Sequence, residues 1–368
     1  MEIAKRLRLS WQLAITVLLA VAMVSTPFLG TATAQAASNA QAGTAIHYSD
    51  KQVLADGGIN YTFNINGVSN ILHEPPDGFT PATATDAQLA EYGFPARPTD
   101  TATLATWTAK WSHFKYQRSS SDPVLTIMSG KVSPGVAASP QVTTHPSSSP
   151  VWSGYADYDV NVNQFQGATG EYNQPTYGSD SQQGASGFSF VGLGGWLNNA
   201  SLMVGSAMVS GPTYYAWYQY TNSSGNYTII RYSGAVNPGD DIELQTYWQP
   251  SSNYPAGFSF FDFNTMTNFY ITAQLTSAYY DGETAEYMDG RPVIATPHNE
   301  GTTPLDDYGS NNWQNCGYWI TAGSGNATPF TNYNYLIFTM QDQKSGDILS
   351  QPSNPNGASF TDTFAKGS

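Results

Sequence analysis

The 368-residue chain has only one cysteine, Cys316, so it cannot form an internal disulfide. It contains neither an HExxH motif nor paired CxxC motifs, so we expect no zinc site and no other metal or cofactor. Histidine is scarce too: of five, only His298 follows residue 150, and there is no GxSxG elbow. A hydrolase that pairs serine or cysteine with histidine is therefore not expected. We predict that Cys316 is a small buried apolar residue.

Basic residues are also few, with 13 Lys and Arg against 27 Asp and Glu, which gives a formal net charge of -14. The whole of this charge lies in residues 151–368, which hold eighteen acidic and four basic side chains. Such a surface repels nucleic acid phosphates and anionic membranes, so neither is an expected partner. It also suits an acidic medium, where protonation of carboxylates reduces self-repulsion, although ordinary solubility explains it equally well.

A long apolar run occurs only at the start of the chain. Residues 1–36 combine a basic beginning, an apolar stretch interrupted by Ser25 and Pro27, and small residues that fit a cleavage site. This pattern predicts a secretory signal peptide. We therefore expect an extracellular protein whose mature form has no membrane anchor.

Composition divides the rest of the chain into three parts. Residues 37–132 are mixed, with a predicted helix that is capped by Thr85 and stopped at Gly93, and a second over residues 101–114. Residues 133–150 are rich in Ser and Pro and predict a linker, which is a candidate processing site.

Residues 151–368 consist of short runs of aromatic and β-branched residues, separated by Gly, Pro, Asn or Ser. This texture predicts an all-β fold, a two-sheet antiparallel β-sandwich. Strands are expected over residues 187–195, 214–221, 226–236, 241–248, 257–264, 268–276, 283–288 and 335–341. Residues 268–276 alternate cleanly, so one of their faces is expected in the core and the other could be a binding surface.

Four carboxylates lie close together in sequence, at Asp281, Glu283, Glu286 and Asp289. Glycosidases use such pairs, but residues an odd number apart point to opposite faces of a strand, so Glu283 and Glu286 diverge unless a bulge intervenes. Asp281 and Glu283 flank a glycine and are expected in a solvated turn. Glu283 and Glu286 are thus not expected to form a glycosidase pair.

Several short motifs follow one another in a fixed order after the linker: WSGY (152–155), FVGLGG (190–195), YYAWYQ (214–219), NPGDDI (237–242), TAEYM (284–288), PLDDYG (304–309), ILSQPS (348–353) and GASFTDTF (357–364). With these motifs, residues 151–364 resemble the glutamic peptidases, the eqolisin or G1 family. Residues 73–98 also resemble the pro-region of bacterial members. The resemblance implies a sandwich of two antiparallel sheets, a pro-segment (residues 37–132) that is removed at acid pH, and an endopeptidase with a Glu and Gln dyad.

The family's glutamate lies in an AEW motif, which Ala285-Glu286-Tyr287 matches with Tyr in place of Trp. By this resemblance, Glu286 is the general base that activates water and then the general acid toward the leaving amine. The family's glutamine, which stabilises the oxyanion, lies in a stretch like SLxQxGT, and its place here falls on Val204. The family's AWYE reads AWYQ, so Gln219 is a candidate substitute. Together with Val204, two aromatic residues, Trp152 and Tyr215, are expected to line the substrate cleft, although Trp152 could equally be a buried aromatic of the sandwich.

Three functions remain open. The first is a monomeric acid endopeptidase that uses Glu286 and Gln219, impaired by Val204. The second is a catalytically inactive relative that binds peptides or cell-wall carbohydrate in its cleft. The third is a lectin-like, carbohydrate-binding sandwich, which the many aromatic residues favour.

Overall fold

The structure, a computed structural model, describes residues 44–131, 147–159, 164–179, 181–182, 184–195, 198–211, 213–291, 293–296, 299–302, 304–321, 326–342 and 344–366. The predicted signal peptide, most of the predicted linker and His298 lie outside these residues. Within the described part of the chain, no helix is long and apolar enough to cross a membrane.

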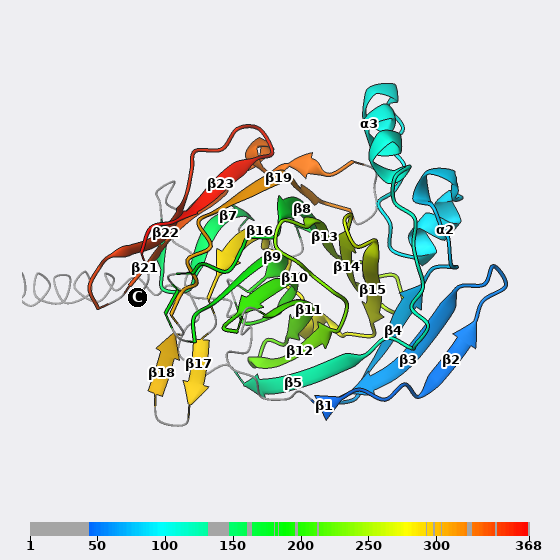
Figure 1. Cartoon of the computed structure of the whole chain (residues 1–368), viewed down its shortest axis with the longest axis horizontal. Coiled ribbons are helices and arrows are strands. Elements are labelled where there is room, and N and C mark those ends of the chain that lie inside the picture. The colour runs from blue at the N-terminus through cyan, green and yellow to red at the C-terminus, as the bar shows by residue number, and fades with distance from the viewer. Residues whose placement is uncertain are drawn as a thin grey trace, which may run out of the picture.

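Two largely antiparallel sheets, A and B, make up most of the molecule (Figure 1), and they are joined by β19 (Ser310–Trp319), which pairs with β23 (Phe360–Phe364) of sheet A and β8 (Gly167–Asn173) of sheet B. Sheet A has the strand order β1 (Thr44–Ala45), β5 (Leu125–Lys131), β12 (Asn226–Tyr232), β11 (Thr213–Thr221), β10 (Ser201–Val209), β9 (Ser186–Gly194), β16 (Thr284–Gly290), β7 (Trp152–Tyr158) and β21 (Tyr335–Gln341). Beyond β21 it continues with β6 (Ser147–Ser149), β22 (Ile348–Pro352) and β23 (Phe360–Phe364).

Sheet B has the order β20 (Thr328–Pro329), β19 (Ser310–Trp319), β8 (Gly167–Asn173), β13 (Asp241–Trp248), β14 (Ala256–Asp262), β15 (Thr267–Ala273), β4 (Val68–Glu74), β3 (Ile59–Ile65) and β2 (Asp50–Val53). The other elements are α2 (Asp86–Glu91), α3 (Thr101–Trp111), the hairpin of β17 (Val293–Thr296) and β18 (Asn299–Thr302), and three short 3-10 turns, η1 (Pro81–Thr83), η2 (Ser277–Tyr279) and η3 (Phe330–Asn332).

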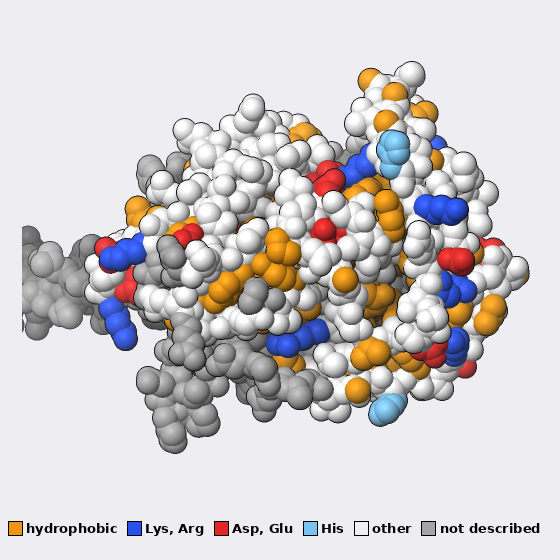
Figure 2. All heavy atoms as spheres, viewed as in Figure 1, with side chains coloured by type: hydrophobic (Ala, Val, Ile, Leu, Met, Phe, Trp, Pro, Cys, Tyr) orange, Lys and Arg blue, Asp and Glu red, His pale blue; other side chains and the backbone are white. Residues whose placement is uncertain are grey.

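The predicted all-β sandwich is confirmed. Alternate residues of each strand point into the space between the sheets, where they form the main core. Val191, Val204 and Tyr218 enter this core from sheet A, and Phe258 and Phe269 enter it from sheet B. On the face of the molecule that Figure 2 shows, charged side chains are few and scattered.

Both predicted helices are present in the segment before the linker. The first begins at a capping box, in which the side chain of Thr85 accepts a hydrogen bond from the Gln88 backbone N–H, and Gln88 Oε1 accepts one from the Thr85 backbone N–H. The second ends at Trp111, three residues before the expected end, and buries Trp107 and Trp111. Local sequence signals therefore located both helices correctly.

The same segment, residues 44–131, completes both sheets. Its strands β5 and β1 extend sheet A beyond β12, while β4, β3 and β2 extend sheet B beyond β15. His73 of β4 covers the outer side of β15, because its ring stacks on Tyr270 at 4.9 Å and its Nε2 lies 2.9 Å from Thr272 Oγ1. This side of residues 268–276 is therefore covered at Tyr270 and Thr272, whereas Gln274 and Thr276 remain exposed.

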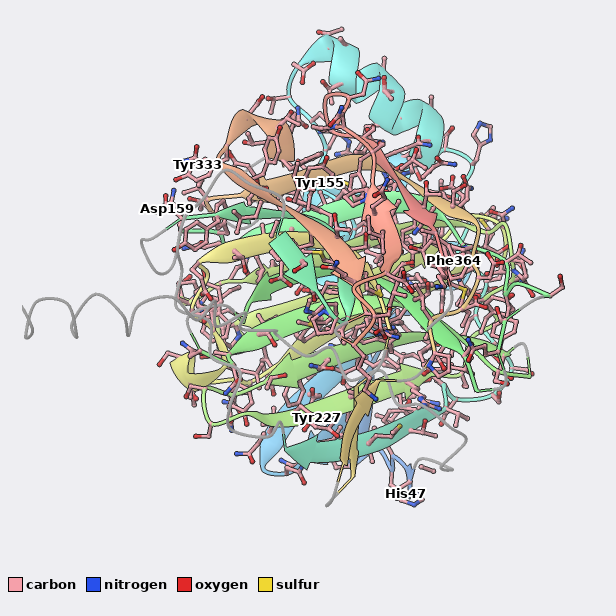
Figure 3. The ribbon with its side chains drawn as sticks, turned by 90° about the vertical axis from the view of Figure 1, so that its left-hand side faces the viewer. His47, Tyr155, Asp159, Tyr227, Tyr333 and Phe364 are labelled. Atoms are coloured by element: carbon pink, nitrogen blue, oxygen red, sulfur yellow. The ribbon has the colours of Figure 1, made fainter. Side chains whose placement is uncertain are left out.

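Several carboxyl groups are buried within the sandwich, where they accept hydrogen bonds from neighbouring side chains. Asp157 on β7 is fully buried, accepts a hydrogen bond from Tyr287 at 3.1 Å, and has its pKa raised to about 8 by burial. Asp289 is also buried, and its pKa is raised for the same reason although Ser189, Asn311 and Trp313 donate to it. At one end of sheet A, by contrast, half-exposed Tyr333 donates to Asp159 (Figure 3).

These raised pKa values predict that the protein is more stable in acid. An aspartate ionises near pH 4 in the unfolded chain, whereas Asp157 ionises near pH 8 in the folded protein. The folded state thus binds more protons between these values, so the free energy of unfolding falls as the pH rises from about 4 to about 8. Thermal unfolding measured across this range should show a falling Tm. Asp157→Asn, which keeps an acceptor for Tyr287, should flatten that fall, and a Tm that rises with pH would contradict the account.

Candidate active site

Glu286 lies in the middle of β16, on the side of sheet A that faces away from the main core. Its neighbours Ala285 and Tyr287 point into that core, so the pleat turns Glu286 to the opposite side. A second apolar cluster covers this side of the sheet, and we call it the Glu286 face: Trp152, Phe188, Phe190, Met203, Ala207, Tyr215, Trp217, Ile229, Met288 and their neighbours. Glu286 is 3% exposed within it.

Residues from four adjacent strands line up with Glu286 across the sheet. Glu286 pairs with Gly192 of β9, Gly192 with Met203 of β10, and Met203 with Gln219 of β11. Because directly paired residues point to the same side of a sheet, all four belong to the Glu286 face. The alignment thus runs from the candidate base to the candidate amide.

Glycine at position 192 makes room for the carboxylate of Glu286. A Cβ atom added at Gly192 would lie 3.0 Å from Oε2 of Glu286 and 3.4 Å from Cγ of Met203. The other carboxylate oxygen, Oε1, accepts a hydrogen bond from Thr284 Oγ1 at 3.2 Å. The carboxylate is therefore placed over β9, between a hydroxyl donor on its own strand and the side chain of Met203.

The structure does not bring Gln219 to Glu286. Three strand spacings separate them, about 14 Å between their Cα atoms. Gln219 is fully buried, and its Nε2 donates to Thr221 Oγ1 at 3.0 Å. The two residues share a face and a cross-strand alignment, but they do not form a dyad in contact.

The prediction that Val204 lines a cleft around Glu286 is wrong. Val204 pairs with Val191 and Tyr218 and lies with them in the main core, on the opposite side of the sheet from Glu286. Met203, one residue earlier, is the residue of β10 that faces Glu286. A shift of one residue reverses the face of a strand, and a loose motif such as SLxQxGT cannot exclude that shift.

Trp152 and Tyr215 both lie on the Glu286 face, each four residues along its strand from the alignment that contains Glu286. Trp152 packs edge-on against Phe188 at 5.9 Å and is tilted against Phe190 at 5.2 Å. Tyr215 carries the guanidinium of Arg231 over its ring at 4.3 Å. They are 6% and 7% exposed, so both are integral to the apolar lining of this face.

The neighbouring carboxylates behave differently from expectation. Asp281 and Glu283 do not form a solvated turn, because they are only 5% and 0% exposed. Burial and the adjacent Glu283 raise the pKa of Asp281 to about 10, and its Oδ1 lies close against Gly194 at the end of β9. Asp281 is thus a buried carboxyl beside the end of β9 whose neutral form is favoured, and its sequence context gave no sign of this burial.

An open pocket of about 800 Å³ lies elsewhere, where the β13–β14 and β15–β16 connections meet. Its lining has no charged residue and includes Trp248, Gln274 and Tyr280. The two aromatic rings stack on each other at 4.7 Å and are almost fully buried. Among the described residues, no group of three or more His, Cys, Asp or Glu side chains could hold a metal ion.

Comparisons with known proteins give matches of low similarity, all of them to solved structures. No protein-family model matches the chain, and no curated protein matches it. A scytalidoglutamic peptidase bound to a peptide-based transition state analogue is similar at 14% identity and a TM-score of 0.46, over 59% of this chain and 98% of the other. SCP-B, a member of the eqolisin family in complex with the tripeptide Ala-Ile-His, is similar at 15% identity, a TM-score of 0.46 and the same coverage.

The opposite orientations of Met203 and Val204 predict opposite responses to glutamine. At Val204, the amide would be buried in the main core among apolar side chains and should lower the free energy of unfolding by about 1–3 kcal/mol, the cost of an unsatisfied polar group. At Met203, the amide would face Glu286 and could hydrogen-bond to it, so the loss should be clearly smaller. Denaturant unfolding of the two variants measures this difference. A larger loss for Met203→Gln would show that the faces are assigned wrongly.

Proposed function

We propose that this protein is an exported, monomeric acid endopeptidase of the glutamic type, in which Glu286 activates the water that attacks the peptide bond. The observation that carries the proposal is the placement of Glu286: a buried carboxylate on an apolar sheet face, positioned over Gly192 and held by Thr284. The ordered sequence motifs resembling the glutamic peptidases agree with this residue as the base. Export rests on the predicted signal peptide.

In this mechanism, the Glu286 carboxylate removes a proton from water as the water oxygen bonds to the carbonyl carbon. The tetrahedral intermediate carries its negative charge on the former carbonyl oxygen. Glu286 then returns the proton to the amine nitrogen as the carbon–nitrogen bond breaks. The apolar lining formed by residues such as Trp152 and Phe190 would exclude bulk water from these steps and bind apolar side chains of the peptide.

The residue beside Glu286 favours a second candidate function. Met203 has no hydrogen that it could donate to the oxyanion, and Gln219 is too distant to take over that role directly. The loss of one such donor slows related chemistry by about 100- to 1,000-fold. A protein that binds peptides on the Glu286 face and cleaves them very slowly or not at all is therefore the alternative.

Glu286→Gln separates the two functions, because it keeps the size of the side chain and removes the base. If the protein is a peptidase, this change should lower kcat by about 100- to 10,000-fold, the usual contribution of a general base. Digestion of casein or haemoglobin across pH 2 to 5 provides the assay. Glu91→Gln, at the end of α2, changes an exposed glutamate outside the Glu286 face and serves as the matched control. Equal activity of the wild type and Glu286→Gln would rule out Glu286 as the base.

Met203→Gln should increase the rate if Met203 occupies the position of an oxyanion donor. An amide at this position could stabilise the developing charge, so we expect kcat to rise by up to about 100-fold. Met203→Leu, which keeps the site apolar, should leave kcat near that of the wild type. A Met203→Gln protein that folds like the wild type and shows no gain would contradict this assignment of the missing donor.

A further inference from the structure

The strands of residues 44–131 form the edges of the sandwich that closes around the main core. We propose that this segment is a permanent part of the folded protein: if the linker of residues 133–150 is cut, the two pieces remain bound without a covalent link. The mature protein would then consist of two chains. This differs from a pro-segment that leaves after cleavage, which the family resemblance implies.

The first support is strand pairing on two sheets at once. In sheet A, β5 pairs with β12 along seven residues, from Asn226 opposite Lys131 to Tyr232 opposite Leu125. In sheet B, β4 pairs with the last three residues of β15, from Ile271 to Ala273. Departure of the segment would leave seven residues of β12 and three of β15 without their strand partners, and natural sheets avoid such unpaired edges.

The second support is the origin of the core. The segment contributes seven buried apolar side chains to the main core: Ile59, Tyr61, Phe63, Ile65, Val68, Leu72 and Leu125. A polar contact also enters that core, where Tyr218 donates to Asn70 of β4 at 3.4 Å. A removable segment would be expected to cover a surface, whereas these side chains fill the interior between the two sheets.

The third support is an ionic contact between α3 and sheet B. Glu171 and Glu243 lie directly opposite each other on β8 and β13, an arrangement that is unfavourable for like charges. Lys110 of α3 reaches both carboxylates at 2.7 Å, and Figure 2 shows acidic and basic side chains together beneath this helix. Near it, Trp111 packs against Phe261 and Phe263 of the sandwich at 5.2 and 4.9 Å.

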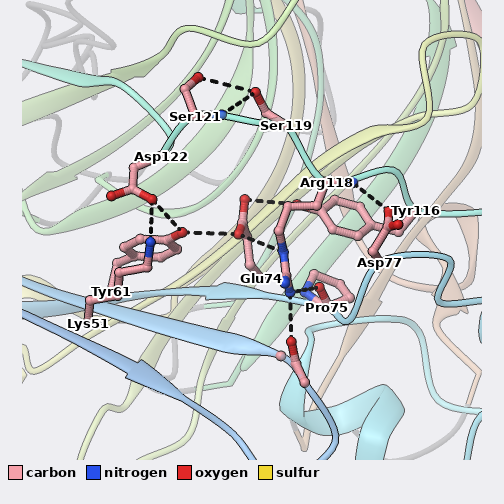
Figure 4. A network of polar contacts seen from close by, with 12 residues as sticks. Lys51, Tyr61, Glu74, Pro75, Asp77, Tyr116, Arg118, Ser119, Ser121 and Asp122 are labelled. Carbon is pink, nitrogen blue, oxygen red and sulfur yellow. Dashed lines mark hydrogen bonds and ion pairs between the residues drawn. The ribbon is translucent and has the colours of Figure 1, made fainter.

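The segment is itself held together by a polar network, which joins its contributions to the two sheets (Figure 4). Glu74, at the end of β4, accepts a hydrogen bond from Tyr116 at 2.9 Å and pairs with Arg118 at 3.3 Å. Tyr61 of β3 donates to Asp122 at 3.2 Å, three residues before β5 begins. The network therefore ties β3 and β4 of sheet B to β5 of sheet A, so the segment can detach only by leaving both sheets.

The segment also contributes to the Glu286 face. Met128 of β5 pairs with Ile229, which pairs with Gln219, so Met128 continues the cross-strand alignment that contains Glu286. Met128 is half-buried at the end of that alignment. The N-terminal piece would thus supply the last strand of the face to which we assign the peptide.

The test is a cut within the full-length protein. A recognition site for a sequence-specific protease is inserted between residues 138 and 139, the folded protein is cut, and size-exclusion chromatography is run at pH 7, at pH 4 and in 1 M NaCl. Strand pairing and apolar burial do not titrate and are not screened by salt, so both pieces should elute together at the volume of the uncut protein in all three buffers. In guanidinium they should separate, which confirms that the cut is complete.

Elution of the N-terminal piece by itself in any of the three native buffers would overturn the proposal. A Lys110→Met protein, cut in the same way, separates the contributions: the pieces should still elute together, because the strands and the core remain. Their separation in this variant would show that the ion pairs hold the segment, as expected of a removable one. None of these readouts depends on peptide hydrolysis, so the proposed activity can fail without affecting the result.

Discussion

The alternation of side chains along the central strands of sheet A is the constraint on which the structure depends. One side of β16, β9, β10 and β11 must be apolar because it packs against sheet B, and that side holds Val191, Val204 and Tyr218. Residues on the other side of these strands, including Glu286, do not pack against sheet B. The cross-strand register determines which residues lie next to Glu286. The same register that closes the core therefore places Gly192 and Met203 beside the carboxylate.

Closure of the sandwich has a second requirement, which residues 44–131 meet. Their strands cap the open edges at β12 and β15, and their side chains fill the space between the sheets at that end. Burial of carboxyls such as Asp157 adds a dependence on protons, since the folded state favours their neutral form. The sandwich, its N-terminal edge and its preference for acid are thus linked through one core.

Much of this fold could be predicted from the sequence, because strand periodicity, turn residues and helix caps are local signals. Thr85 and Gln88, for example, form a capping box within four residues, and this motif predicts where the helix begins. The assignment of β10 failed because its residues are almost all apolar or small, so both of its faces look alike and no alternation separates Met203 from Val204. Pairing with β9 resolves the choice, and that contact is distant in sequence.

Burial of single polar residues was equally beyond local signals. Asp281 and Glu283 flank a glycine as turn residues do, yet tertiary packing encloses both. Likewise, the exchange of glutamate for glutamine at position 219 suggested a rewired partner for Glu286, and only the strand order shows how far apart the two lie. The distance between two residues across a sheet depends on the order of the strands, and a short sequence motif does not contain that information.

The central claim is that the Glu286 face binds the peptide and presents its scissile bond to the carboxylate. It is tested most directly by a crystal structure of the Glu286→Gln protein with a bound peptide. The account predicts the peptide lying across β16, β9 and β10, with one carbonyl carbon facing position 286 and Met203 beside its oxygen. A peptide bound in the pocket near Trp248, or on the outer side of sheet B, would contradict it.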